Sequence, residues 1–291
     1  DAITNGDKNI AVGYDVLTTN DSGNNNTAIG YEALKLNVSG DGNTAIGYEA
    51  LESNTSHGNT AIGKSASKSN TGGGGNTAIG QSALALNTGG DYNVAIGGNA
   101  LLNNTADRQT AIGTYALYSN TGGSANTAIG YGALLDNTTG NRNTAIGQSA
   151  YDDADDEDDN LAIGYDALGG TNAGGEKNIA IGNYSLDAAL TGDGDNNVAI
   201  GYQSLSANTS GDQNVAIGNQ SLSDNTDGER NTAVGDGAMF LNQTGVRSAA
   251  FGYVSGKSGD QNASFGAYSL TAVTGNNNTA VGYYAGAAGG G

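Results

Sequence analysis

Apolar and polar residues follow one another along this chain in a short unit that recurs at steps of about 17 residues. The unit reads Asn-Thr-Ala-Ile-Gly, as at residues 26–30, and a leucine such as Leu34 follows its glycine by four positions. The glycines of the seventeen copies are Gly13, Gly30, Gly47, Gly63, Gly80, Gly97, Gly113, Gly130, Gly147, Gly164, Gly182, Gly201, Gly218, Gly235, Gly252, Gly266 and Gly282. A period this short and regular predicts a solenoid, in which each repeat forms one coil stacked on the last.

Two segments of each coil have the composition of short β-strands, Thr-Ala-Ile before the glycine and Ala-Leu-x after it. The column before the glycine (Ile29, Ile46) and the leucine column (Leu34, Leu51) are the persistent large apolar positions. We therefore expect these two columns to point inward and form a thin core, while the small residues beside them point outward. In the opposite phase, alanine lies inside and an exposed isoleucine column requires a partner.

Asparagine recurs at two positions of the coil, at the head of the motif (Asn26, Asn43) and seven residues after the glycine (Asn20, Asn37). At equivalent places in stacked coils, asparagine amides can hydrogen-bond up and down in ladders. We expect these asparagines to be structural, and a glycan-binding or ice-ordering array is the alternative.

Composition narrows the classes of partner. The net charge of −19 disfavours nucleic acid and anionic membranes as partners, and no apolar run is long enough for a membrane span. Cysteine is absent, so there is neither a disulfide framework nor a thiolate metal site. The repeat is uninterrupted, which predicts one repetitive domain over residues 1–291, as a segment of a longer fibre or a filament subunit.

The motif resembles the head repeats of trimeric autotransporter adhesins in Ala28-Ile29-Gly30 and its equivalents, followed by the small residue at Ala33 or Ser185. Similar runs, as at residues 26–34, look like those of bacteriophage tail-fibre proteins. The resemblance implies a left-handed parallel β-roll that forms trimers. The coil here is about three residues longer than the adhesin head coil, and no stalk or anchor sequence is present.

The expected fold is thus an all-β parallel β-solenoid of about 17 coils with about 17 residues each, associated as a homotrimer because its core is thin. The expected function is structural: the shaft or head of an extracellular adhesin or phage tail fibre, at a cell surface or on a virion. Such a fibre presents multivalent contacts to a glycan or protein receptor. The alternatives are an end-to-end filament subunit and an ice- or glycan-binding solenoid.

Two groups of residues are candidate sites. A run of acids fills one turn, and its side chains are candidate Ca²⁺ ligands, against the alternative of a solvated acidic turn: Asp152, Asp153, Asp155, Asp156 and Asp158. Tyrosines that directly follow the glycine are candidates for stacking on sugars, against ordinary packing over a corner: Tyr14, Tyr31, Tyr48, Tyr131, Tyr165 and Tyr202. No arrangement of a nucleophile with a base is seen, and His57 is the single histidine, so we expect no enzyme and no cofactor other than calcium.

Overall fold

The computed structural model describes residues 6–170, 175–188, 194–273 and 275–287, and its regular elements are short parallel strands. Each strand has three residues and lies directly before one of the repeated glycines. The strands are β1 (Ile10–Val12), β2 (Thr27–Ile29), β3 (Thr44–Ile46), β4 (Thr60–Ile62), β5 (Thr77–Ile79), β6 (Val94–Ile96), β7 (Thr110–Ile112), β8 (Thr127–Ile129), β9 (Thr144–Ile146), β10 (Leu161–Ile163), β11 (Ile179–Ile181), β12 (Val198–Ile200), β13 (Val215–Ile217), β14 (Thr232–Val234), β15 (Ala249–Phe251), β16 (Ala263–Phe265) and β17 (Thr279–Val281). No helix of the described residues is long and apolar enough to cross a membrane.

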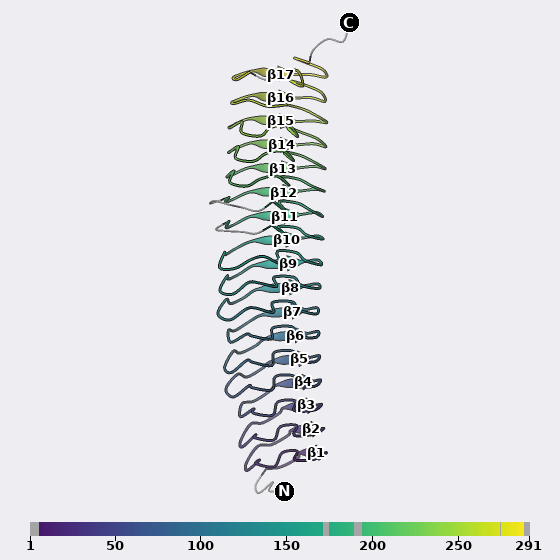
Figure 1. The fold of residues 1–291 in the computed structure, drawn as a ribbon, viewed down its shortest axis with the longest axis vertical. Helices are drawn as coiled ribbons and strands as arrows, with labels where there is room; N and C mark the ends of the chain where they lie inside the picture. Colours follow the sequence, from purple (N-terminus) through teal and green to yellow (C-terminus); the bar gives the residue numbers. More distant parts are fainter. Residues whose placement is uncertain (1–5, 171–174, 189–193, 274, 288–291) are drawn as a thin grey trace. The chain divides into compact units, whose positions relative to one another are not determined.

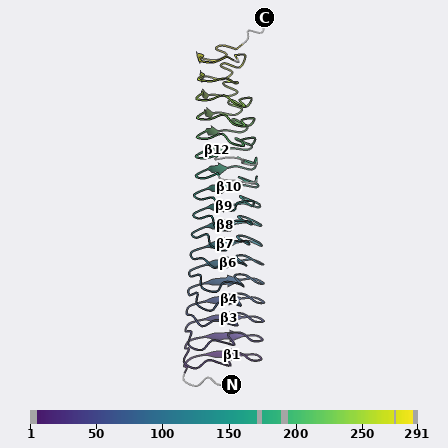
Figure 2. The same ribbon diagram turned by 60° about the vertical axis from the view of Figure 1, so that its left-hand side comes forward.

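Contacts group the chain into two units, Asp1–Asn143 with β1–β8 and Thr144–Gly291 with β9–β17. Within each unit, every strand pairs in parallel with the strand of the next coil, as Figures 1 and 2 show. The pairing is in register, so that Ala28 lies opposite Ala45 and Ile29 opposite Ile46. This confirms the predicted parallel β-solenoid with about 17 residues per turn.

The sequence predicted that the isoleucine of each strand points inward and the alanine outward, and this prediction is wrong. The alanine at the centre of each strand from β2 to β14 points inward and is fully buried, whereas the isoleucine or valine before the glycine points outward. Ala45 is 0% exposed and Ile46 is 36% exposed. The physical reason is the narrow interior: leucine from the opposite side of the coil fills the middle, and only a methyl group fits against it. The core therefore consists of the alanine and leucine columns.

The predicted second strand, Ala-Leu-x, does not form. Its alanine and leucine are neighbours in sequence and are both fully buried, as at Ala33 and Leu34, which an extended strand would not allow. Leu34 has a φ of 50°, and Glu32 two residues earlier has a φ of 54°. These left-handed residues curl the chain into a turn, so that consecutive side chains both enter the core.

Both asparagine columns are buried and form the predicted ladders. At the head of the motif, the Oδ1 atom of Asn26 accepts the backbone N–H of Asn43 at 2.9 Å, and its Nδ2 atom donates to the Gly40 carbonyl at 2.7 Å. In the second column, the Nδ2 atom of Asn37 donates to Asn20 Oδ1 at 2.9 Å. Most rungs satisfy polar groups that the thin core would otherwise leave unpaired, and the exceptions among the described residues are Asn137 Oδ1, Asn178 Nδ2 and Asn242 Oδ1. The structural interpretation of these asparagines is confirmed.

Candidate interaction face

The outward side of the strands forms one continuous surface in each unit. We call the first and third residues of the strands the strand face. In most coils of the first unit these are a half-exposed threonine and an exposed isoleucine, as in β3 and β4. In-register pairing aligns each kind of side chain in its own row, for example Thr44 beside Thr60 and Ile46 beside Ile62. The strand face is therefore flat and periodic.

The strand face carries no charged side chain, although the chain has a net charge of −19. Acidic and basic residues lie instead on the turns of each coil, as Glu32, Lys35 and Asp41 do. A surface free of charge is unusual on so acidic a chain, because exposed surface on a soluble protein normally mixes charged with apolar groups.

The strand face becomes wholly aliphatic over β10–β13. Its first row there is Leu161, Ile179, Val198 and Val215, and its second row is Ile163, Ile181, Ile200 and Ile217. Farther along the same unit, the rings of Phe251 and Phe265 stack with their centroids 5.2 Å apart and their planes 5° from parallel. Such a contiguous apolar patch is typical of a surface that binds another protein.

The candidate sugar-binding tyrosines lie exposed at the corner after each strand, and the structure pairs them in two ways. Tyr31 stacks face to face on Tyr14 at 5.3 Å and on Tyr48 at 5.0 Å. Both faces of the Tyr31 ring are thus covered by protein, and only the edge of the ring is exposed. The acidic neighbours act on the same rings, since the Glu32 carboxylate raises the pKa of Tyr31.

The other candidate tyrosines meet partners that the sequence pattern did not single out. Tyr131 contacts Tyr115 edge to face at 5.9 Å, and Tyr184 lies between Tyr165 and Tyr202 with interplanar angles of 71° and 89°. Tyr115 and Tyr184 stand two residues after their glycines rather than one. Their shared offset in the repeat was the signal that could have found them. Sugar binding by these tyrosines stays a prediction.

The candidate calcium ligands all lie on one turn and differ in exposure. Asp152 and Asp158 are half-buried, while Asp153, Asp155 and Asp156 are exposed. Burial raises the pKa of Asp152 to about 6, and the backbone N–H of Asp155 donates to Glu157 Oε2 at 2.9 Å. Within the described residues, none of these aspartates belongs to a group of three acidic side chains that converge within 4.8 Å. Calcium binding at this turn stays a prediction.

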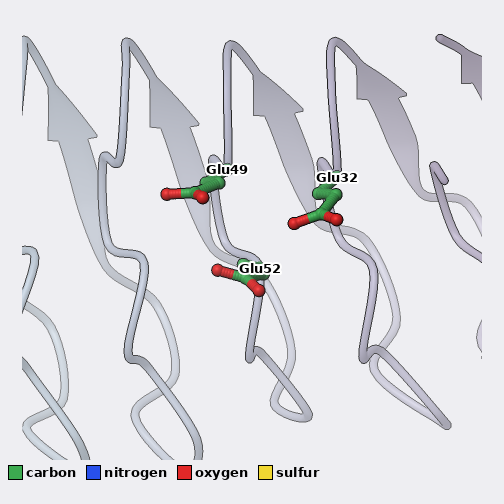
Figure 3. A group of neighbouring side chains, drawn as sticks. All are labelled: Glu32, Glu49 and Glu52. Carbon is green, nitrogen blue, oxygen red and sulfur yellow. The ribbon is translucent and has the colours of Figure 1, made fainter. Parts of the chain in front are cut away.

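The acidic side chains that do converge are Glu32, Glu49 and Glu52, on two neighbouring coils (Figure 3). Two lysines form ion pairs with the three carboxylates of this group. Lys68 Nζ lies 2.6 Å from a Glu49 carboxylate oxygen and 3.3 Å from Glu52, and Lys35 Nζ lies 2.7 Å from Glu32. The hydrogen bond from Lys68 lowers the pKa of Glu49. The cluster is thus an ion-pair network between coils. The spacing of 17 between Glu32 and Glu49 was the sequence signal for it.

Comparison with known proteins found no protein-family model and no curated protein that match this chain.

Proposed function

We propose that this chain is a structural fibre module whose copies associate through their strand faces. The observation that carries the proposal is the strand face itself: a flat, periodic, charge-free surface on a chain with a net charge of −19. Copies of so acidic a chain repel one another wherever their turns meet. The strand face is the surface on which they can approach without bringing like charges together.

The repeat also favours partners of the same kind. Two faces with the same step between coils can match side chain to side chain along their whole length. Each coil then contributes a small apolar contact, centred on residues such as Ile46 and Ile79, and many such contacts add up. The resemblance to trimeric adhesin heads favours three chains, with every strand face turned toward a common axis.

In this proposal the assembly is the shaft or head of an extracellular adhesin or a phage tail fibre, at a cell surface or on a virion. Its role is mechanical and multivalent. The fibre places the exposed turns at a distance from the surface that bears them, and repetition multiplies weak contacts with a glycan or protein receptor. The chain is a scaffold rather than an enzyme.

Sedimentation velocity and native mass spectrometry of the purified chain test the proposal. The unmodified chain is expected to sediment as a trimer. A double variant, Ile46→Asp with Ile79→Asp, places two charges on the strand face and is expected to shift the equilibrium to the monomer. The matched control is Leu36→Asp with Leu86→Asp, which alters two leucines that are at least as exposed but lie on turns, and which should leave the trimer intact. A monomeric unmodified chain, or equal loss of association in both double variants, contradicts the proposal.

A second candidate function is favoured by the position of the threonines. Thr27, Thr44 and Thr60 face outward in one row beside the isoleucine row, so the strand face alternates hydroxyl and apolar groups at regular spacing. A flat array of this kind can order water and bind ice. Thermal hysteresis of the solution measures that activity. An ice-binding face must be open to water, so a trimer closed through the strand face would exclude this function.

A further inference from the structure

One coil is three residues shorter than the coil before it. The step from Gly235 to Gly252 is 17 residues, and the step from Gly252 to Gly266 is 14. The strands on both sides keep their register, with Ala249 opposite Ala263 and Phe251 opposite Phe265. The missing residues therefore belong to the turn region between Lys257 and Ser258. Residues 241–243 of the preceding coil have no counterpart there.

The shortening leaves backbone donors unpaired. In the complete coil below, the N–H groups of Asp224 and Thr226 donate to carbonyls of the next coil, at 3.1 Å and 2.9 Å. The N–H of Asp227 donates likewise at 3.3 Å. Their equivalents one coil later are the N–H groups of Leu241, Gln243 and Thr244, and none of these has an acceptor among the described residues. Three backbone donors thus face the place of the missing turn.

The second asparagine ladder ends at the same place. The Nδ2 atom of Asn242 donates to Asn225 Oδ1 at 3.2 Å and to the Gly245 carbonyl at 3.1 Å, as in other rungs. Its own Oδ1 is buried without a hydrogen-bond partner, because the next coil has no asparagine to supply one. Asn242 is 0% exposed, whereas its chain neighbours Leu241 and Gln243 are exposed.

A hollow occupies the surface above these groups, and we call it the short-coil notch. Its polar half has a volume of about 370 Å³ and is lined by Gln243, Thr244, Ser258, Asp260 and Asn276. Its apolar half has a volume of about 210 Å³ and is lined by Phe240, Val254, Thr271 and the stem of Lys257. Leu241 lines both halves. Both halves are open to solvent, and the polar half alone has the volume of a small-molecule site.

We propose that the short-coil notch binds a neutral N-acetylated sugar. Sugar hydroxyls both donate and accept, so they match a mixed array of backbone N–H donors and the Asp260 carboxylate. The Asp260 oxygens already accept from the Val246 N–H at 3.1 Å and from Asn276 Nδ2 at 3.2 Å, and each carboxylate oxygen can accept a second hydrogen bond. The acetamido group fits the boundary between the halves: its carbonyl accepts a free backbone N–H, and its methyl group packs on Leu241 and Val254. The notch lies on the turns and not on the strand face, so the proposal does not depend on association of the chain.

Calorimetric titration of the full chain with N-acetyl-D-glucosamine tests the proposal, with D-glucose as the comparison sugar. A single small ligand in an open notch should bind weakly, with a dissociation constant on the order of 1 mM. Glucose lacks the acetamido group and should bind at least about tenfold more weakly, because it loses one hydrogen bond and the packing of one methyl group. Absence of binding, or equal binding of both sugars, overturns the proposal.

Two variants locate the site. Thr244→Tyr fills the notch from an exposed position and should abolish binding, whereas Asp227→Tyr alters the equivalent exposed position one coil earlier and should leave it unchanged. Inserting Leu-Asn-Gln between Lys257 and Ser258 restores the missing turn. The insertion should also abolish binding and should raise the denaturation midpoint, because the new asparagine can donate to Asn242 Oδ1. Binding that survives Thr244→Tyr and the insertion contradicts the proposal.

Hydrogen exchange gives a readout at the proposed contacts. The amides of Leu241, Gln243 and Thr244 should exchange quickly in the free chain and be protected by N-acetyl-D-glucosamine. A peptide probe, acetyl-Leu-Asn-Gln-amide, mimics the missing residues. If this peptide protects the same amides more strongly than the sugar does, the notch is a peptide site and the sugar proposal is wrong.

Discussion

Asn225 donates from its Nδ2 atom to the Oδ1 atom of Asn208 at 2.8 Å, and both side chains are fully buried. The same Nδ2 donates to the Gly228 carbonyl at 3.1 Å, and Asn225 Oδ1 accepts from Asn242 at 3.2 Å. The side-chain amide of Asn225 thus forms one hydrogen bond within its own coil and one with each of the two neighbouring coils. Because the apolar core of each coil is only alanine and leucine, these rungs add hydrogen bonds between coils where little apolar surface is available to be buried.

Replacing Asn225 with alanine should destabilise the fold strongly. The change leaves Asn208 Oδ1 buried without a partner, while the Gly228 carbonyl keeps its bond from Asn214 Nδ2 at 2.7 Å and Asn242 Nδ2 keeps its bond to the Gly245 carbonyl at 3.1 Å. An unpaired buried acceptor costs about 1–3 kcal/mol, so the free energy of unfolding should fall by about that amount. Denaturant unfolding followed by circular dichroism measures it. Asn219→Ala is the control, since Asn219 is exposed and should change stability by less than about 0.5 kcal/mol. Equal effects would contradict a structural ladder.

The inward alanines should tolerate no enlargement. Ala61 is 0% exposed in the centre of β4, and Ala61→Leu would force extra methyl groups into a closed interior, at a cost of about 1–3 kcal/mol. Ile62 is 37% exposed beside it, and Ile62→Ala should cost less than about 1 kcal/mol in the monomer, mostly from lost contacts along the isoleucine row. Thermal unfolding at low protein concentration compares the two. A larger loss of stability for Ile62→Ala than for Ala61→Leu would contradict the observed phase and support isoleucine on the inward side.

The period of the sequence predicted the solenoid, the parallel strands and the asparagine ladders, because each follows from identical residues stacked at identical positions. The phase of the strand could not be predicted in the same way. Alternation places Ala45 and Ile46 on opposite faces but does not say which face is inside. The width of the interior decides, and that width depends on the left-handed turn that brings Ala50 and Leu51 inward together.

The candidate sites were less predictable, because they depend on how neighbouring coils meet. The pattern found Tyr31 but not that Tyr14 and Tyr48 cover both faces of its ring. The short-coil notch follows from a 14-residue step that is visible in the glycine spacing, although the loss of a partner for Asn242 appears only once the ladder is known. The ion pairs of Lys68 likewise join residues on neighbouring coils that lie 16 and 19 positions apart in the sequence.

Substitution should destabilise the chain at one glycine of a coil and be nearly neutral at another. Gly47 has a φ of 142°, and an added Cβ would collide with the backbone carbonyl of Gly63, so Gly47→Ala should cost more than about 3 kcal/mol or prevent folding. Gly42 has a φ of 66° with open space around it, and the equivalent position one coil earlier holds Asn25 at a φ of 57°. Gly42→Asn should therefore be nearly neutral. Circular dichroism and the denaturation midpoint of both variants test this, and a folded, stable Gly47→Ala chain would contradict it.

Stability should depend on pH through Asp152. Burial raises the pKa of this carboxyl from its ordinary value of 3.8 to about 6, so the folded chain binds a proton more tightly than the unfolded chain does. Its contribution to the free energy of unfolding is therefore fully present below the ordinary pKa and is lost as pH rises through about 6. Asp152→Asn removes the buried charge and should raise the denaturation midpoint at pH 8.

Denaturation midpoints measured between about pH 3 and pH 8 check this expectation, since that window spans both pKa values of Asp152. The gain from Asp152→Asn should shrink as pH falls and vanish near the ordinary pKa. Asp156→Asn is the matched control, because Asp156 is exposed on the same turn and its replacement removes an equal charge without relieving burial. If both variants stabilise the chain equally at pH 8, repulsion among the acids of the turn is the cause. Burial of Asp152 would then contribute nothing.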